Sequence, residues 1–295
     1  MSRPATSFSA WWLAARPATL SASAAPVLVG ISLAWAAGQF VAGPALAALL
    51  GALLLQIGAN FANDVYDYER GADTAERLGP ARATQQGWIS AARMKRAMLA
   101  AFAAALGIGV YLTAVAGWPV LALGLSALAA AWLYTGGPRP YGYVGLGDPA
   151  VFVYFGLAAV AGTYYVQALS LSLLVWLAAI PMGALATAIL VVNNLRDIDT
   201  DAKAAKHTLA VRMGDAWTRR YYLALLLLAY AMPLLMIGWA GATWWVLLSW
   251  LSLPFAVALA RRVRVERGLA LNPCLAHTAK LEFGYAVLLA LGLSL

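Results

Sequence analysis

Long apolar segments alternate with short polar segments along the whole chain. A window of about 20 residues, the length at which an α-helix crosses a bilayer, finds nine predominantly apolar segments. They lie near residues 17–37, 44–64, 94–115, 119–136, 148–167, 172–194, 220–238, 243–260 and 277–294. This pattern predicts an all-α polytopic membrane protein with nine transmembrane helices, organised as a single domain over residues 1–295.

The composition supports a membrane protein and excludes several other classes. Of the 295 residues, 63% are hydrophobic and only 11% are charged, whereas about a quarter of the residues of a soluble domain are charged. The single cysteine excludes a disulfide scaffold. A net charge of +8 would indicate a nucleic-acid partner only if it formed a basic face on a folded domain. Here the charges lie in short loops, so we expect no nucleic-acid partner.

The basic residues lie on one side of the predicted membrane. The four connections 38–43, 115–119, 167–172 and 239–243 contain no charge of either sign. The Lys and Arg residues instead precede the first segment or lie between an even-numbered segment and the first residues of the next, and Lys280 lies near the start of the ninth. By the positive-inside rule the N-terminus and the charged loops are cytoplasmic.

The acidic residues are concentrated where two of the segments meet the cytoplasm. Nine of the 12 Asp and Glu residues lie in two short stretches, namely Asp64, Asp67, Glu69, Asp73 and Glu76, then Asp197, Asp199, Asp201 and Asp215. Carboxylates at the edge of a membrane span are costly unless they are paired or bind a metal. These two stretches are therefore the candidate functional site.

Helical spacing divides these acids into two faces. At about 100° per residue, a wedge of the second predicted helix holds Gln56, Asn60, Asn63, Asp64 and Asp67, and one wedge of the sixth holds Asn193, Asn194, Asp197 and Asp201. Glu69 and Asp199 point away from these wedges. Each wedge combines carboxylate and amide oxygens, which are the ligands that Mg²⁺ prefers.

Basic residues in the same loops indicate an anionic ligand. They are Arg70, Arg77, Arg82, Lys203, Lys206 and Arg212. Carboxylates beside cations suit a diphosphate, because Mg²⁺ bridges it to aspartates and Lys or Arg neutralise the remaining charge. Solvated loop acids, a structural metal site and a cation-coupled transporter are the alternatives. The concentration of acids at one membrane face favours the diphosphate site over a transporter.

Two sequence motifs resemble those of a known family. Residues 60–73 read NFANDVYDYERGAD and resemble the first Asp-rich motif of the UbiA-type membrane prenyltransferases, and residues 193–201 read NNLRDIDTD and resemble the second. The general family pattern has a third aspartate where this chain has Gly71, with Asp73 two residues later. Whether Asp73 binds metal is therefore left open. A CDP-alcohol phosphotransferase is disfavoured because Tyr68 and Glu69 follow Asp67 in place of its Gly and Ala-Arg pattern.

Five further blocks look like the 1,4-dihydroxy-2-naphthoate branch of this family, which acts in menaquinone biosynthesis. They are residues 16–20 (RPATL), 79–82 (GPAR), 134–148 (YTGGPRPYGYVGLGD), 206–214 (KHTLAVRMG) and 271–281, which begins LNP and ends TAKL. The resemblance implies nine helices around a central cavity, with cytoplasmic caps formed by the loops after the second and sixth helices. It also implies the bacterial cytoplasmic (inner) membrane as the location, with the active site facing the cytoplasm.

The resemblance also implies a reaction and roles for individual residues. The partners are the lipid bilayer, a polyprenyl diphosphate and 1,4-dihydroxy-2-naphthoate, and the reaction releases diphosphate and CO₂ and gives demethylmenaquinone. The cofactor is Mg²⁺, with the ligands Asn60, Asp64, Asp67, Asn193, Asp197 and Asp201. Arg82, Lys206 and Arg212 would bind the diphosphate, and Tyr134 and Tyr143 would face the allylic cation. Arg139, Lys280 or Arg16 would hold the aromatic carboxylate, and Asn63 and Asn194 would contact substrate.

Two properties stay open at this point. Enzymes of the same family use 4-hydroxybenzoate or homogentisate, and the two Asp-rich motifs alone do not distinguish those acceptors from the naphthoate. The sequence predicts neither the length of the prenyl chain nor the oligomeric state.

Overall fold

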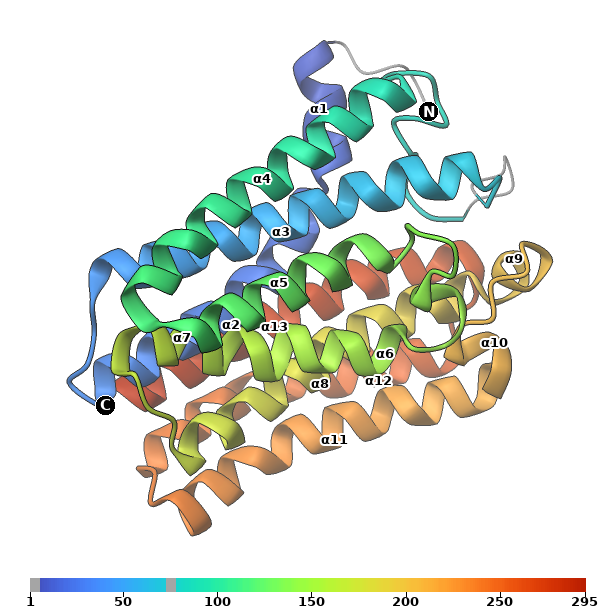
Figure 1. Ribbon diagram of the computed structural model, residues 1–295. Helices are drawn as coiled ribbons and strands as arrows, with labels where there is room; N and C mark the ends of the chain where they lie inside the picture. Colours follow the sequence, from blue (N-terminus) through green and yellow to red (C-terminus); the bar gives the residue numbers. More distant parts are fainter. Residues whose placement is uncertain (1–5, 73–77) are drawn as a thin grey trace.

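The protein is a bundle of long helices, most of which run along one common axis (Figure 1). A computed structural model describes residues 6–72 and 78–295, and these residues form helices and loops but no strand. The predicted all-α class is therefore confirmed. Most of the large exposed side chains on the outside are apolar, and Trp118, Trp239 and Trp244 are 77%, 68% and 72% exposed. This is the surface that a lipid-embedded protein presents, with tryptophans at the ends of the helices.

Each predicted apolar segment is helical. In chain order they are α2 (Pro17–Ala36), α3 (Ala42–Glu69), α4 (Ala91–Ala116), α5 (Trp118–Leu133), α6 with η2 and α7 (Gly147–Val151, Phe152–Ala158 and Ala159–Ala168), α8 (Leu173–Arg196), α11 (Asp215–Ala240), η3 with α12 (Trp244–Ser252 and Leu253–Val265), and η4 with α13 (Gly268–Ala270 and Leu271–Ser294). In the described residues, eight of these helical segments are long and apolar enough to cross a membrane. The remaining one, α5, has 16 residues, so nine crossings remain a prediction.

The helix α8, which carries the second motif, is the most enclosed of the long helices. In its apolar stretch 78% of the residues are buried, against 17% in α4. It packs against α2, α11 and α13, and Val175, Leu185, Ala188 and Val192 are buried in the shared core. The motif at its end is therefore held by packing on several sides.

Two glycines let α8 approach the segment that follows the 134–148 block. A Cβ atom on Gly156 would lie 2.5 Å from the Cα of Gly183, and one on Gly183 would lie 2.7 Å from the carbonyl oxygen of Phe152. Gly156 lies in η2, which is a π-helix. The two backbones touch here, as they do where small residues line a helix interface in a membrane.

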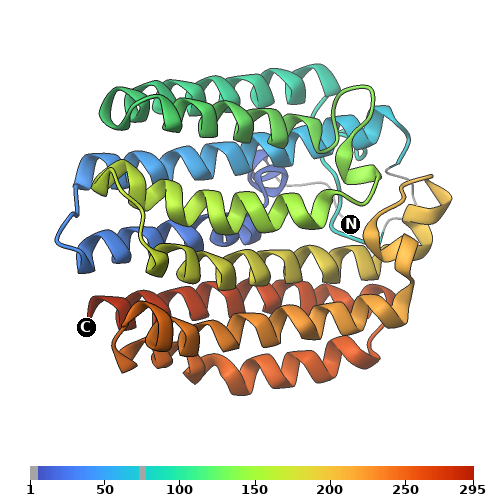
Figure 2. The same cartoon turned by 60° about the horizontal axis from the view of Figure 1, so that its bottom comes forward.

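The loops that carry the two motifs gather at one end of the bundle, and the C-terminus lies at the other end (Figures 1 and 2). At this loop end lie η1 (Tyr141–Tyr143), α9 (Ile198–Lys203) and α10 (Leu209–Met213). A further helix, α1 (Ser7–Ala15), lies across the axis of the bundle (Figure 1). It was not predicted, since nine residues are too few to cross a bilayer.

Candidate active site

Asp64, near the C-terminal end of α3, holds the following loop in place. Its carboxylate accepts hydrogen bonds from the backbone N–H groups of Ala83 (3.0 Å) and Thr84 (2.9 Å), and the residue is 1% exposed. A carboxylate that accepts two N–H groups is satisfied although it is buried. The loop after α3 therefore folds back over the first motif.

Asp67, one turn further along α3, makes contacts with two other segments. Its Oδ2 accepts from Nη2 of Arg82 at 3.0 Å, and its Oδ1 accepts from the hydroxyl of Tyr143 at 2.7 Å. The Tyr143 ring lies near two cations, with Nζ of Lys206 5.3 Å and the guanidinium carbon of Arg70 5.8 Å from its centroid. Arg82 and Tyr143 thus contact Asp67 directly, and Lys206 and Arg70, two of the basic loop residues, lie beside the Tyr143 ring.

The amides of the first wedge hold neighbouring helices. Nδ2 of Asn60 donates to the carbonyl of Ala15 (2.9 Å) and to the hydroxyl of Thr19 (3.0 Å), and Oδ1 of Asn63 accepts from Thr135 at 3.0 Å. Arg16 lies between α1 and α2 with φ 52°, beside the residue that Asn60 contacts. The predicted substrate residue Arg16 is therefore next to the first motif.

The second motif begins in α8 and continues into α9. Asp197 ends α8 with φ −96° and ψ 9°, yet its carbonyl accepts from the N–H of Asp201 at 2.7 Å, so the helical turn is kept. Asp197 and Asp201 are 9% and 8% exposed, and Asn194 is 4% exposed. Three members of the predicted polar wedge are therefore enclosed at the loop end.

A buried arginine that the sequence analysis left out lies at the centre of this motif. Arg196 donates through Nε to Oδ1 of Asp197 (2.7 Å) and through Nη2 to its Oδ2 (2.5 Å). Nη2 also reaches Oδ1 of Asn193 at 2.9 Å, and Nη1 reaches Oδ1 of Asn272 in α13 at 2.8 Å. The sequence indicates this role by the position of Arg196 inside the NNLRDIDTD run, because an Arg next to a buried Asp is the nearest counter-charge of that Asp.

Asp201 shows that the two motifs face each other. Burial raises the pKa of its carboxyl to about 6, and the nearby ammonium of Lys206 acts in the opposite direction. The carboxylates of Asp197 and Asp67 add to the rise. Lys206 also lies over the ring of Tyr143, whose hydroxyl binds Asp67, so the two motifs lie close together. Nζ of Lys206 lies 3.6 Å from Oδ1 of Asp201, and Oδ2 of Asp201 is buried with no hydrogen-bond partner in the described residues.

Tyr134 is packed beside these carboxylates. Its ring meets that of Tyr141 edge-on at 5.4 Å between centroids. The carboxylates of Asp148, Asp67 and Asp201 lie near enough for their charges to act on its hydroxyl. Gly142 and Gly147 lie against the ring, because an added Cβ on either would come within 3.3 Å of it. The Gly-rich 134–148 block thus folds around this tyrosine.

Three predicted substrate residues lie further out. Arg139 and Lys280 have exposed side chains, and neither makes a hydrogen bond or ion pair with a site carboxylate within the part of the chain that the structure describes. Arg212 is also exposed, and its Nε would lie 3.4 Å from a Cβ on Gly145. Asp73 and Arg77 lie outside the described residues.

The donor set fits a hard divalent cation that is shared with a phosphate ligand. No group of three or more His, Cys, Asp or Glu side chains in residues 6–72 and 78–295 gathers around one point. Mg²⁺ does not need such a group, because it is commonly held by one or two carboxylates and by substrate phosphates. The unpartnered Oδ2 of Asp201 and the free lone pairs of the other carboxylates can serve it.

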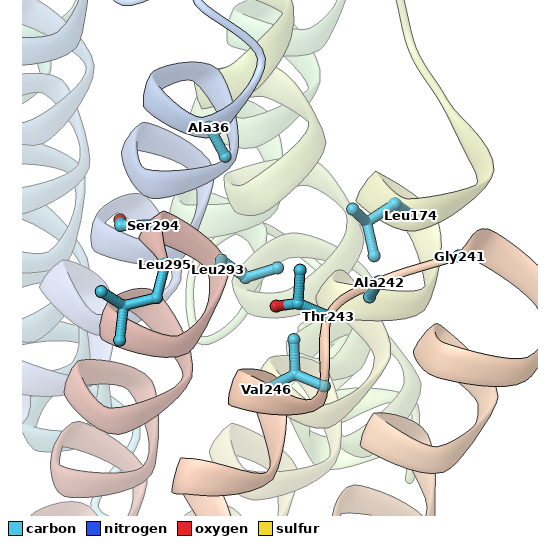
Figure 3. Close-up of a pocket in the computed structure, with 9 residues that line it drawn as sticks. All are labelled: Ala36, Leu174, Gly241, Ala242, Thr243, Val246, Leu293, Ser294 and Leu295. Carbon is cyan, nitrogen blue, oxygen red and sulfur yellow. The ribbon is translucent and has the colours of Figure 1, made fainter.

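A separate pocket lies at the opposite end of the bundle from the motifs (Figure 3). It has a volume of about 310 Å³ and is lined by Ala36, Leu174, Gly241, Ala242, Thr243, Val246, Leu293, Ser294 and Leu295. It contains no predicted site residue and no charged side chain. This pocket is therefore separate from the candidate site.

Known proteins place the chain in a family. The model of the UbiA prenyltransferase family matches residues 23–276. The 1,4-dihydroxy-2-naphthoate octaprenyltransferases of Haemophilus influenzae and Escherichia coli are 41% and 40% identical, over 96% and 97% of this chain and 95% of each relative. The same-named protein of Mycobacterium tuberculosis is 42% identical over 89% of this chain and 88% of its own length.

Solved structures confirm the fold. A UbiA homolog from Archaeoglobus fulgidus bound to DMAPP and Mg²⁺ superposes with a TM-score of 0.67 at 14% identity, over 95% of this chain and 98% of that one. The apo structure of a UbiA homolog from Aeropyrum pernix also gives a TM-score of 0.67, at 16% identity over 91% and 96%. Sequence and structure agree that this protein belongs to the UbiA prenyltransferase family.

Proposed function

We propose that this protein transfers a polyprenyl group from polyprenyl diphosphate to 1,4-dihydroxy-2-naphthoate and so makes demethylmenaquinone. The observation that carries the proposal is the identity of 40–42% to three naphthoate octaprenyltransferases along nearly the whole chain. The site supports it, because two carboxylate motifs and several cations meet at one end of an apolar bundle. The setting is a bacterial cytoplasmic membrane, with the site on the cytoplasmic side.

The carboxylates and amides of the two motifs are the proposed Mg²⁺ ligands: Asn60, Asp64, Asp67, Asn193, Asp197 and Asp201. When bound, Mg²⁺ would neutralise the charge that grows on the departing diphosphate. Oδ1 of Asn60 and of Asn193 each accepts one hydrogen bond, from Gln56 (3.2 Å) and from Arg196 (2.9 Å). An amide oxygen has two lone pairs, so each retains one for a cation.

Three basic side chains are the proposed diphosphate partners. Arg82 and Lys206 lie on Asp67 and Asp201 at 3.0 and 3.6 Å, and Arg212 follows them on α10. Preorganised cations stabilise a leaving group whose charge increases as the bond breaks. A guanidinium has five N–H donors and an ammonium three, which suits a ligand as rich in acceptor oxygens as a diphosphate.

The tyrosines Tyr134 and Tyr143 suit the allylic end of the donor. The ring of Tyr143 already lies within 6 Å of two protein cations, at 5.3 and 5.8 Å, which is the range of a cation–π attraction. Its hydroxyl donates to Asp67 at 2.7 Å, which directs the oxygen toward that carboxylate, and the π face itself carries no nucleophilic atom. The π face can therefore stabilise an allylic cation without trapping it as an ether.

For the aromatic carboxylate we propose Arg139, Lys280 or Arg16 as the counter-charge. Of the three, Arg16 lies next to the first motif, because the carbonyl of its neighbour Ala15 accepts from Asn60. In the reaction the allylic C–O bond breaks and its electron pair leaves with the diphosphate. The ring carbon that bears the carboxylate forms the new C–C bond to the allylic carbon. The bond between that ring carbon and the carboxylate then breaks, CO₂ departs, and the electron pair of this bond restores the aromatic ring.

Release of CO₂ tests this proposal directly. Membranes containing the protein are given Mg²⁺, a polyprenyl diphosphate and 1,4-dihydroxy-2-naphthoate labelled at its carboxyl carbon. We expect labelled CO₂, demethylmenaquinone after oxidation, and little product from 4-hydroxybenzoate, whose prenylation keeps the carboxylate. Efficient prenylation of 4-hydroxybenzoate without CO₂ release from the naphthoate would overturn the acceptor and leave the diphosphate chemistry in place.

A further inference from the structure

One side chain outside both motifs joins the segments that carry them. Asn272 lies in the first turn of α13, and its Oδ1 accepts from Nη1 of Arg196 at 2.8 Å. Its Nδ2 donates to the backbone carbonyl of Leu78 at 2.9 Å. These contacts connect residues that are 76 and 194 positions apart in the chain. The amide therefore links α8, α13 and the loop that follows α3.

On one side of this link, Arg196 fixes the ligands of the second motif. Its guanidinium holds both oxygens of Asp197 and the amide oxygen of Asn193, at 2.5 to 2.9 Å. The Arg196 side chain is 1% exposed, so solvent does not replace these partners. A planar guanidinium that is held at Nη1 by Asn272 cannot rotate without breaking its contacts with Asp197. Asn272 thus sets the direction of the Arg196 plane.

On the other side, Leu78 belongs to the loop that returns to the first motif. Arg82 in the same loop pairs with Asp67 at 3.0 Å, and the N–H groups of Ala83 and Thr84 bind Asp64. Two sets of contacts therefore hold the loop, one with the aspartates of α3 and one with the Asn272 amide of α13.

We propose that Asn272 is a positioning residue that sets the spacing between the two carboxylate motifs and so the affinity of the site for a divalent cation with diphosphate. This inference rests on the proposed function of the site. Residues that orient metal ligands through hydrogen bonds typically change metal affinity or activity by about 10- to 100-fold when they are removed. An amide can accept from Arg196 through its oxygen and donate to a carbonyl through its nitrogen at the same time.

Substitutions separate the two bonds. Asn272→Leu has a side chain with the same branching and loses both bonds. Asn272→Asp keeps an acceptor for Arg196 but has no donor for Leu78 when ionised. The matched control is His277→Gln, further along α13, whose ring contacts Phe255 at 5.8 Å between centroids. Each purified protein is titrated with Mn²⁺ in the presence of inorganic diphosphate, and the bound ion is followed by electron paramagnetic resonance. Thermal unfolding is recorded for each.

We expect Asn272→Leu to weaken Mn²⁺ binding by about tenfold or more, Asn272→Asp to weaken it less, and His277→Gln to leave it unchanged. The Mg²⁺ concentration for half-maximal transfer should rise in the same order. An unchanged Mn²⁺ affinity in Asn272→Leu would overturn the inference. So would a loss of Mn²⁺ binding that is explained entirely by a smaller amount of folded protein. The binding assay contains no aromatic acceptor, so it reports on the metal site independently of the reaction. Tight Mn²⁺ binding by the natural protein without prenyl transfer would therefore contradict the proposed function and not the role of Asn272.

Discussion

Asp67 and Arg82 form a buried ion pair between the end of α3 and the loop that follows it. Oδ2 of Asp67 and Nη2 of Arg82 are 3.0 Å apart, and the two side chains are 5% and 7% exposed. The other oxygen of Asp67 accepts from Tyr143. One carboxylate of the first motif thus carries contacts to two separate loops, and its charge is balanced before any substrate binds.

Replacing Arg82 by methionine should destabilise the protein as well as abolish transfer. Removing one partner of a buried pair leaves an uncompensated charge, which costs about 3–5 kcal/mol. The double variant Asp67→Asn with Arg82→Met removes both charges, and we expect it to lose less stability than the sum of the single variants. Denaturant or thermal unfolding in detergent measures these differences.

The exposed Arg93 in α4 provides the control for this experiment. Arg93→Met removes a cation of the same size from the surface, where substitutions usually change stability by less than about 0.5 kcal/mol. If Arg82→Met unfolded at the same temperature as Arg93→Met, the ion pair would contribute nothing to the fold.

Two acids five residues apart on α3 should respond in opposite ways. Asp64→Ala removes a proposed metal ligand and the acceptor of two backbone N–H groups, so we expect transfer to be lost. Glu69 pairs with Lys95 at 2.8 Å, but the two side chains are 39% and 40% exposed. Such a pair contributes about 0–1 kcal/mol, so Glu69→Ala should keep the activity. Both rates are normalised to the amount of protein recovered from membranes. Equal damage from the two variants would contradict the assignment of helix faces.

Much of this arrangement follows from periodicity in the sequence, and a definable part does not. The apolar stretches located the long helices, and the 100° wedges located the buried Asp64, Asp67, Asp197 and Asp201 because helix geometry fixes which residues share a face. These inferences use only residues that lie within about two helical turns of one another in the sequence.

What escaped prediction depends on contacts between distant segments. Asn272 meets Leu78 across 194 positions, and no local pattern encodes such a contact. The helix α1 is held by Trp11, whose ring meets that of Phe61 edge-on at 5.7 Å, and by the bond from Asn60 to Ala15. The π-helical turn of η2 follows from its close packing on α8. Tertiary packing decides these features, and a residue's own neighbours in sequence do not.

Tyr143 contributes a ring and a hydroxyl, and two substitutions separate them. Tyr143→Phe removes the hydrogen bond to Asp67 (2.7 Å) but keeps a π face near Lys206 and Arg70. Tyr143→Leu removes both. A hydrogen bond to a charged group contributes about 1.5–3 kcal/mol, so Tyr143→Phe should slow transfer by roughly 10- to 100-fold. We expect Tyr143→Leu to be slower still, in a rate measured at saturating substrates. Equal rates for the two variants would mean that the ring has no part in the reaction.

The contact between α8 and η2 should be sensitive to a single methyl group. In Gly183→Ala the new Cβ would lie 2.7 Å from the carbonyl oxygen of Phe152, a backbone atom that cannot rotate away. Overpacking of this kind costs about 1–3 kcal/mol. Gly107 in α4 has nothing within 4 Å of an added Cβ, so Gly107→Ala should stabilise the helix by up to about 1 kcal/mol. Thermal unfolding compares the two, and a Gly183→Ala protein as stable as Gly107→Ala would show that the backbones separate easily.

The orientation of the bundle in the membrane is the last prediction, and it rests on charge. The connections 115–119 and 239–243 contain no charged residue, whereas the loop after α3 and the segment around α9 are rich in Lys and Arg. Because basic loops are retained in the cytoplasm, reporter fusions at residues 116 and 241 should report a non-cytoplasmic position, and fusions at 80 and 205 a cytoplasmic one. Residue 80 lies in the loop that contacts Asp64 and Asp67, so it marks the side of the site as well. An external reporter at residue 80 would reverse the orientation and would place the diphosphate site away from the cytoplasmic supply of its substrates.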